Sequence, residues 1–343
     1  MHRERLDLYM ANLDRFVTLF GVPEFVIPHL SRFVSEGEME LVIRLDGEKC
    51  SVLEVASRLD GALEDVQDFL ISCYNRHIVH KEELDGELVY YGADFYELLD
   101  YLCKFDIDYY LIEEGLKKAL DQWCYSVYAE RMDSYLDSLK NREVVDRCPE
   151  TFLMIEDLDE VLESVSDIRV VPCNCRKLAE HCAKPVETCL SFDETITDRT
   201  SGRSLTKEEA KALIKTAHRN GLMHQVNSDW KTKGPTYICN CCSCCCYPIR
   251  LAQEKGTKGV FPVIRYVAQY DETKCSHCGV CAKRCHFEAF YLGDAETVVK
   301  GKARRRVMFD QSKCWGCGIC VEACTGKAIS MVQAIDDGAE KAQ

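Results

Sequence analysis

Two stretches near the C-terminus carry the most specific pattern in the chain: CSHCGVCAKRC at residues 275–285 and CWGCGICVEAC at residues 314–324. Each holds four cysteines in the spacing C-x2-C-x2-C-x3-C, and the second stretch begins 39 residues after the first. The two stretches are therefore a repeat of one motif. Zinc ribbons use two separated C-x2-C pairs instead, so consecutive runs of four cysteines favour iron–sulfur ligation over a pair of zinc sites.

This repeat closely resembles the bacterial-type two-cluster ferredoxin domain, over about residues 260–330. Two residues between ligands let a tight loop wrap three corners of an Fe4S4 cube, and the fourth cysteine then points at the other cube. The resemblance implies two [4Fe-4S] clusters. It assigns Cys275, Cys278, Cys281 and Cys324 to one cluster, and Cys314, Cys317, Cys320 and Cys285 to the other.

Two features depart from the family pattern. The family usually has proline after the fourth cysteine, whereas this chain has His286 and Thr325, which restore a backbone N–H beside the cluster sulfur. The spacer at residues 286–313 is long and predicts two strands around a turn. Its basic residues form either a docking patch for an acidic partner or a solvated edge. They are Lys300, Lys302, Arg304, Arg305 and Arg306.

Ten further cysteines lie upstream, in VPCNCRKLAEHCAKPVETCL at residues 171–190 and in ICNCCSCCCYPIR at residues 238–250. Two additional cubanes need eight thiolates. Within the second stretch, Cys239-x2-Cys242-x2-Cys245 repeats the spacing that wraps a cube, and Cys241-x2-Cys244 forms an offset register. The candidate ligands upstream of the ferredoxin-like repeat are Cys173, Cys175, Cys182, Cys189, Cys239, Cys241, Cys242 and Cys245.

The combination of PCNCR with CNCCSCCC resembles a group of poorly characterised anaerobe iron–sulfur proteins, over about residues 150–330. This resemblance implies cluster binding and no named reaction. We favour two extra cubanes, which gives up to four [4Fe-4S] clusters in total. Three alternatives stay open: one cluster with spare thiols, a larger non-cubane cluster, or a structural zinc at Cys173, Cys175, Cys182 and Cys189. We expect His181, His218 and His224 to be surface or core residues and not ligands.

The composition indicates an intracellular setting. The chain has 343 residues, of which 23 are cysteine, and no apolar run approaches the roughly 20 residues of a membrane span. The charged N-terminus lacks the apolar stretch of a signal peptide, so we expect a cytoplasmic protein without a membrane span. In a long unexported chain, cysteine enrichment favours metal or redox chemistry over disulfides. Crowded thiolates oxidise readily and suit an anaerobic cell.

The N-terminal half is acidic and mainly helical. Residues 1–150 hold 16 Lys and Arg against 32 Asp and Glu, a net charge of −16. Residues 38–95 read as helix, turn, helix and hairpin, with Asp85-Gly86 at the hairpin turn, and this stretch resembles a winged helix. Its second helix carries Glu64, Asp65 and Asp68 against a single Arg76, so we expect protein docking and not nucleic-acid binding.

These patterns predict an α+β protein in three parts and a tail: an acidic helical, winged-helix-like domain (1–150), a Cys-rich iron–sulfur domain (151–258), a 2[4Fe-4S] ferredoxin domain (259–332) and residues 333–343. We find no catalytic residues, no dinucleotide motif and no P-loop. We expect an electron-transfer protein that is a subunit or partner of a larger anaerobic oxidoreductase complex, with a redox protein as partner and with homo- or hetero-oligomer contacts through the N-terminal helices. The alternatives are a redox-sensing DNA-binding regulator, or an enzyme at an unusual cluster in the Cys-rich domain.

Overall fold

The structure is a computed structural model, and it divides the chain into two compact units. The first unit comprises residues 1–127 and 198–201, and the second comprises the remainder. The division falls inside one long helix, and the domain limits predicted at residues 150 and 258 stay predictions. None of the described helices is long and apolar enough to cross a membrane. The described residues are 2–143, 145, 148–199, 201–299 and 301–334, so most of the predicted tail at 333–343 lies outside them.

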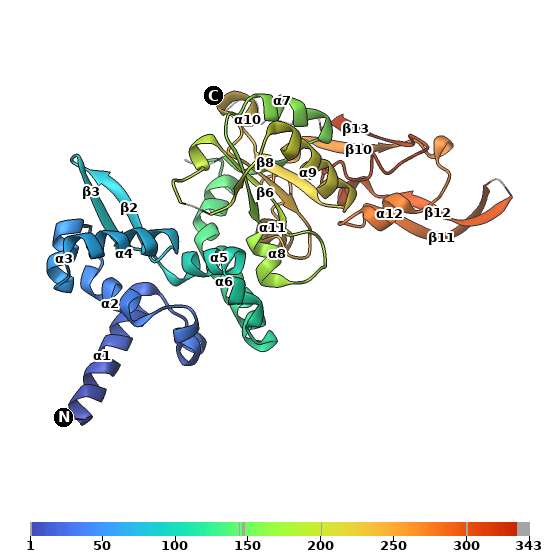
Figure 1. Cartoon of the computed structure of the whole chain (residues 1–343). Coiled ribbons are helices and arrows are strands. Elements are labelled where there is room, and N and C mark those ends of the chain that lie inside the picture. The colour runs from blue at the N-terminus through green and yellow to red at the C-terminus, as the bar shows by residue number, and fades with distance from the viewer. Residues whose placement is uncertain (1, 144, 146–147, 200, 300, 335–343) are drawn as a thin grey trace. The chain divides into compact units, whose positions relative to one another are not determined.

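The first unit is mainly helical and contains a three-stranded antiparallel sheet in the order β1-β3-β2, of which Figure 1 shows β2 beside β3. Helices and strands together make the chain a mixed α and β protein, as the sequence predicts. The elements of this unit, up to the helix in which the division falls, are α1 (His2–Phe20), η1 (Glu24–Arg32), α2 (Glu36–Leu45), β1 (Cys50–Ser51), α3 (Val52–Leu59), α4 (Leu63–Asn75), β2 (Val79–Leu84), β3 (Glu87–Gly92), α5 (Phe95–Phe105), η2 (Ile107–Leu111) and α6 (Glu114–Lys140).

The hairpin predicted around Asp85-Gly86 is confirmed. Leu84 of β2 pairs with Glu87 of β3, which leaves two residues in the loop. Both loop residues have positive φ, 53° for Asp85 and 83° for Gly86. Positive φ at both central positions is the geometry of a type I′ turn, which matches the natural twist of the two strands.

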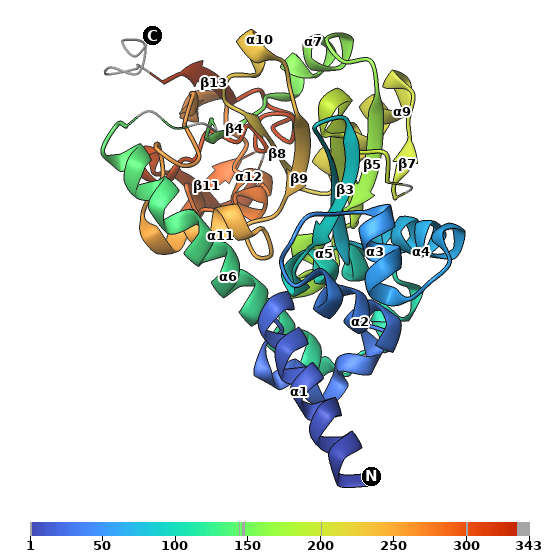
Figure 2. The same ribbon diagram turned by 90° about the vertical axis from the view of Figure 1, so that its left-hand side faces the viewer.

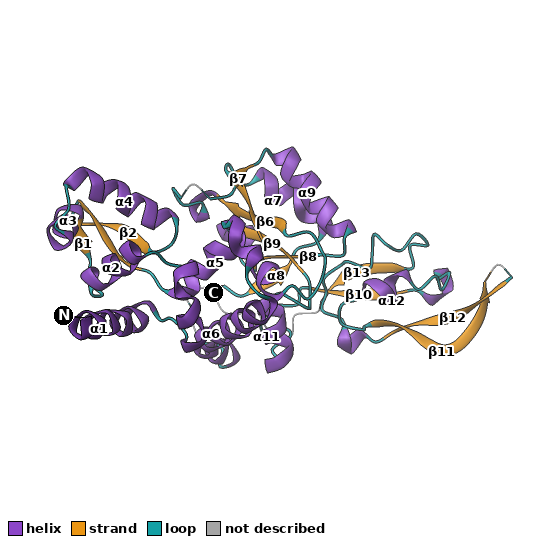
Figure 3. Ribbon diagram, turned by 60° about the horizontal axis from the view of Figure 1, so that its bottom comes forward, coloured by secondary structure: helices purple, strands orange, loops and turns teal. Residues whose placement is uncertain are grey.

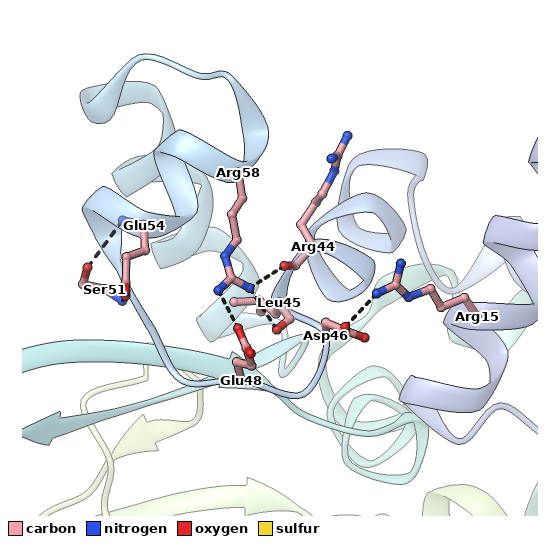
Figure 4. A network of polar contacts seen from close by, with 8 residues as sticks. All are labelled: Arg15, Arg44, Leu45, Asp46, Glu48, Ser51, Glu54 and Arg58. Carbon is pink, nitrogen blue, oxygen red and sulfur yellow. Dashed lines mark hydrogen bonds and ion pairs between the residues drawn. The ribbon is translucent and has the colours of Figure 1, made fainter.

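Arg58 of α3 holds the C-terminal end of α2 (Figure 4). Its guanidinium donates to the carbonyls of Arg44 at 2.8 Å and Leu45 at 3.3 Å, and it pairs with Glu48 at 2.5 Å. The last carbonyls of a helix have no partner within the helix, so an arginine there satisfies them and complements the helix dipole. This contact fixes α3 against α2.

The ends of neighbouring helices are capped in the same region (Figure 4). Asp46 ends α2 in a left-handed conformation and pairs with Arg15 of α1 at 2.7 Å. Hydrogen bonding from Arg15 lowers the pKa of Asp46. Ser51 begins α3 with a capping box, in which its side chain accepts from the Glu54 backbone and Glu54 accepts from the Ser51 backbone. These local signals explain why the helices begin and end where they do.

A short segment distant in sequence completes the first unit. The Tyr74 hydroxyl at the end of α4 donates to Asp198 at 2.7 Å, and the guanidinium of Arg199 lies 4.1 Å from the centre of the Tyr74 ring. Arg199 also donates to the Tyr74 carbonyl at 3.0 Å, and Lys81 of β2 pairs with Asp198. Residues 198–201, which lie in sequence between the two Cys-rich stretches, therefore belong to the first unit.

The second unit contains a six-stranded antiparallel sheet in the order β4-β8-β9-β6-β5-β7, and Figure 2 shows β8 beside β9. An apolar core that includes Phe192, Ile214 and Trp230 packs α7 and α9 against it. A capping box formed by Thr206 and Glu209 begins α9. The elements of this part are β4 (Glu150–Phe152), η3 (Ile155–Asp157), α7 (Leu158–Glu163), β5 (Ile168–Pro172), α8 (Asn174–Ala179), β6 (Glu187–Phe192), η4 (Asp193–Thr195), β7 (Arg203–Ser204), α9 (Lys207–Arg219), β8 (Met223–Asn227), α10 (Trp230–Lys233), β9 (Tyr237–Cys241) and α11 (Tyr247–Lys255).

The ferredoxin-like repeat follows in the same unit. The first and last strands of this region, β10 and β13, pair with each other, and β11 and β12 form the long hairpin that the spacer sequence predicts (Figure 3). Six of the eight cysteines of the repeat pack with Phe290, Val307 and Ile329 in a small core. The elements are β10 (Tyr266–Tyr270), η5 (Glu272–Lys274), α12 (Val280–Arg284), β11 (Phe290–Val299), β12 (Lys302–Phe309), η6 (Gln311–Lys313) and β13 (Ile329–Gln333).

Candidate metal centres

The eight cysteines of the C-terminal repeat lie in two groups of four, and each group includes one cysteine from the other motif. Burial and the nearby thiols of Cys275, Cys278 and Cys324 together raise the pKa of Cys281 to about 11. Burial likewise raises the pKa of Cys320, whose neighbouring thiols are Cys317, Cys314 and Cys285. Each group thus contains three cysteines of one loop and the fourth cysteine of the other loop, and that each group ligates one cluster stays a prediction.

Backbone N–H groups point at several of these sulfurs. Cys275 Sγ accepts from His277 at 3.3 Å, and Cys324 Sγ accepts from Ala328 at 3.2 Å. Cys314 Sγ accepts from the backbone of residues 268 and 316, each at 3.5 Å. Hydrogen bonds to ligand sulfur are one of the means by which a protein sets the reduction potential of a cluster.

Gly316 lies where the second cysteine loop passes close to strand β10. Its φ is 68°, and a Cβ at this position would lie 2.1 Å from the carbonyl oxygen of Tyr266. No residue with a side chain fits without moving the backbone. Gly279 and Gly318 also have positive φ, 76° and 70°. At these three positions the chain uses a backbone conformation that glycine adopts without strain.

His286, which stands where the family has proline, joins the repeat to the Cys-rich run. Its Nε2 donates to the Gly221 carbonyl at 2.8 Å, so the neutral ring presents Nδ1 to accept from the Ser243 hydroxyl at 3.1 Å. Burial lowers the pKa of His286 and favours this neutral form. Arg284 makes a parallel connection by donating to the His218 carbonyl at 2.7 Å.

The arginines of the β11–β12 hairpin are held locally. Arg304 donates to the Ser276 carbonyl at 3.2 Å, and Arg306 pairs with Glu272 at 2.5 Å. Arg305 donates back to carbonyls of its own hairpin, at 2.9 and 3.0 Å. These contacts tether the hairpin to the first cysteine loop. Lys300 of the predicted basic patch lies outside the described residues.

Strand β9 presents its cysteines on one face and Asn240 on the other. Because side chains alternate along a strand, Cys239 and Cys241 share a face. Asn240 accepts from His224 on β8 and donates to the carbonyl of Thr188 on β6, with its side chain buried. The sequence CNC is therefore a strand with thiols toward one side and a structural amide toward the other.

Six thiols come together beside this strand. Their side chains hydrogen-bond in a closed circuit in which each contacts two others, and we call this set the six-thiol ring. Hydrogen bonds from Cys175 and Cys241 lower the pKa of Cys246 to about 5, and those from Cys189 and Cys241 lower the pKa of Cys239 to about 6. The pKa values of the other four thiols are raised, so the ring favours the metal-binding thiolate at these two positions. The members, in order around the ring, are Cys173, Cys175, Cys246, Cys241, Cys239 and Cys189.

The other four upstream thiols form a compact four-thiol group, made of Cys182, Cys242, Cys244 and Cys245. Their Sγ atoms all lie within 4.8 Å of one another, and three of the distances are 3.8 Å. Four sulfurs bound tetrahedrally at about 2.3 Å are about 3.8 Å apart. A cubane holds its thiolates farther apart, because each binds a different iron. The four-thiol group therefore has the dimensions of a site for one zinc or iron ion.

Arg176 of α8 lies between the ring and the four-thiol group. It is 2% exposed, and it donates to the carbonyls of Asn240 at 2.7 Å and Pro185 at 2.6 Å. Burial acts to lower the pKa of Arg176, but the nearby thiols of Cys173 and Cys242 outweigh it and raise that pKa. A hydrogen bond from Cys245, together with the charge of Arg176, lowers the pKa of Cys242 to about 3. One buried cation thus stabilises thiolates on both sides.

The histidines near these sites have partners other than thiols. His218 and His224 are buried and stacked, with Nδ1 of the first 3.0 Å from Nε2 of the second. Burial lowers the pKa of His224 to about 4. His181 bonds the Cys244 carbonyl through Nδ1 at 2.8 Å. That the three histidines are not ligands stays a prediction.

The upstream cysteines that are neighbours in sequence do not all belong to the same site in the structure. Cys182 joins the four-thiol group, while Cys173, Cys175 and Cys189 join the ring. The register Cys239-x2-Cys242-x2-Cys245 is split, because the first of these thiols faces the ring. Cys244 and Cys246 are not among the sixteen candidate ligands named from the sequence. The crowding of cysteines at residues 239–246 is the sequence signal that could have included them. Cys50, Cys73, Cys103 and Cys124 are buried single thiols of the first unit.

Comparison with known proteins agrees with the geometry of the C-terminal repeat. Residues 274–328 match the family described as a 4Fe-4S dicluster domain. No curated protein matches the chain. The segment that contains the repeat is therefore an iron–sulfur, ferredoxin-like segment.

Proposed function

We propose that this protein is an iron–sulfur electron-transfer protein whose dicluster segment carries the electrons. The observation that carries the proposal is the match at residues 274–328 together with the two groups of four thiols within it. Four cysteine ligands occupy every iron of a cubane, so substrate cannot bind there and outer-sphere electron transfer is the chemistry that remains. The ligands proposed for one cubane are Cys275, Cys278, Cys281 and Cys324, and those for the other are Cys314, Cys317, Cys320 and Cys285.

The first unit is proposed as a docking module for a protein partner within a larger redox complex of an anaerobic cytoplasm. The order α2-β1-α3-α4-β2-β3 supports the winged-helix resemblance. On α4, Glu64, Asp65 and Asp68 are exposed. Arg76 pairs with Glu38 at 2.7 Å and donates to the Phe33 carbonyl at 3.0 Å, so its charge is used within the fold. This acidic face repels phosphate and suits a basic protein surface.

An anaerobic potentiometric titration followed by EPR tests electron transfer. We expect reduction to give the signals of two interacting [4Fe-4S]+ clusters, and reoxidation to restore the starting spectrum. A protein that takes up no electrons at its dicluster segment would contradict the proposal. A gel-shift assay at about 150 mM salt distinguishes electron transfer from the alternative, a redox-sensing DNA-binding regulator. Sequence-specific DNA binding that changes on cluster oxidation would favour the regulator.

A further inference from the structure

The six-thiol ring is too open for a single ion. Two sulfurs bound to one ion at about 2.3 Å cannot be more than about 4.6 Å apart. Among the described residues, the four-thiol group is the one set in which three or more potential ligand atoms all lie within 4.8 Å of one another. No three thiols of the ring can therefore share one ion. The ring needs either several ions or a cluster.

The number of thiols exceeds what a cubane uses. A [4Fe-4S] cluster has four irons and takes one cysteine at each. All six ring thiols are buried or half-buried, and each hydrogen-bonds to two others, so the geometry sets none of them apart as a spare. A cubane in the ring would leave two buried thiols without a role in ligation.

Two buried donors beside the ring lack partners. Gln225 is 1% exposed and lies opposite Cys239 in the β8–β9 pairing, and its Oε1 accepts from Cys246 Sγ at 3.7 Å. Its Nε2 has no hydrogen-bond partner in the structure, and neither has Nε of Arg176. A buried N–H without a hydrogen-bond partner is destabilising. Inorganic sulfide of a cluster is an acceptor that would satisfy such donors.

We infer that the six-thiol ring holds one iron–sulfur cluster that is larger than a cubane and is ligated by Cys173, Cys175, Cys189, Cys239, Cys241 and Cys246. The metal charge compensates the thiolates, and Arg176 adds one positive charge at the edge. Gln225 donates to a cluster sulfide. This site is separate from the dicluster segment, and the inference does not depend on whether that segment transfers electrons.

Six single Cys→Ser variants of the ring in the full chain, purified anaerobically with 57Fe, test the ligand number by Mössbauer spectroscopy. We expect each of the six variants to alter the same component of the Mössbauer spectrum, namely a component from iron outside the dicluster segment. The dicluster EPR signal should persist and so show that the chain has folded. Cys148→Ser is the matched control, because it removes a thiol of the same unit that lies outside the ring, and it should leave the spectrum unchanged.

The pattern among the six variants decides the outcome. If two of them keep the parent spectrum, the ring holds a cubane and two spare thiols, and the inference is wrong. If all six keep it, the ring binds no iron, which also overturns the inference.

Two measurements remain informative if the serine variants do not fold. The parent chain should hold more than about 13 iron atoms, since the two cubanes account for eight, a cubane in the ring would add only four, and the four-thiol group holds at most one. A value of 13 or fewer would contradict a larger cluster. Gln225→Leu should shift the midpoint potential of the ring component to a more negative value and leave the dicluster potentials unchanged, since a donor to cluster sulfur is lost. An unchanged midpoint potential of the ring component would show that Gln225 does not donate to the cluster.

Discussion

Cys241 and Cys242 are adjacent in sequence, yet their thiols belong to different sites. Cys241 contacts Cys239 and Cys246 in the six-thiol ring, whereas Cys242 Sγ lies 3.8 Å from Cys182 Sγ in the four-thiol group. The end of β9 at Cys241 produces this division, because the chain leaves the sheet there and turns toward α11. The run of cysteines thus serves two sites at once.

The four-thiol group gives a prediction about a single metal ion. Cys244→Ser should release one zinc or mononuclear iron per chain, because it removes one of four tetrahedral ligands. The iron of the ring and of the dicluster segment should stay. Elemental analysis with Mössbauer spectroscopy measures both. Cys246→Ser is the matched comparison two residues away, and it should keep the single ion. Loss of about four iron atoms from Cys244→Ser would show a cubane at this group instead.

The dicluster segment should lose its clusters one at a time. Cys278→Ser and Cys317→Ser each remove a ligand from a different group, so each should remove or convert one cubane and lower the iron content by up to about four. EPR of the reduced variants should then show one cubane without the magnetic interaction of the pair. If either variant disturbed both cubanes equally, the proposed division of the ligands would be contradicted.

Gly316 should be intolerant of any side chain. In Gly316→Ala the new Cβ meets the Tyr266 carbonyl at 2.1 Å, so the loop must move in addition to bearing a strained φ. We expect the variant to lose iron from the Cys314–Cys320 loop. Gly301→Ala is the matched control, since Gly301 has φ of 75° and nothing within 4 Å of the added Cβ. It carries the same backbone strain, about 1 kcal/mol, without the clash. Equal iron loss in the two variants would show that the close approach is unimportant.

Acid should destabilise the first unit through His77. Burial and the charge of Arg199 together lower the pKa of His77 to about 4. The unfolded chain binds a proton near pH 6.5, whereas the folded chain does not until about pH 4. The stability contributed by His77 is therefore complete above pH 6.5 and falls between pH 6.5 and 4, by up to about 3 kcal/mol. An NMR titration of the His77 ring measures the pKa directly. A midpoint near 6.5 would contradict the prediction.

The sequence predicts the local features of this fold well. The cysteine spacing of the repeat, the Asp85-Gly86 hairpin and the Thr206/Glu209 capping box each depend on residues that are close in the chain. The grouping of the upstream thiols depends on the register of β9 against β6 and β8, which spacing within one segment does not reveal. The return of Asp198 to Tyr74, 124 residues away, likewise has no local signal.

Anomalous diffraction from anaerobically grown crystals of the intact chain, recorded on both sides of the iron edge, would locate the iron at all three sites. We expect two cubanes in the dicluster segment, iron density of a larger cluster within the six-thiol ring, and a single ion within the four-thiol group. Iron confined to the dicluster segment, with the ten upstream thiols free of metal or bound to single ions alone, would contradict this expectation.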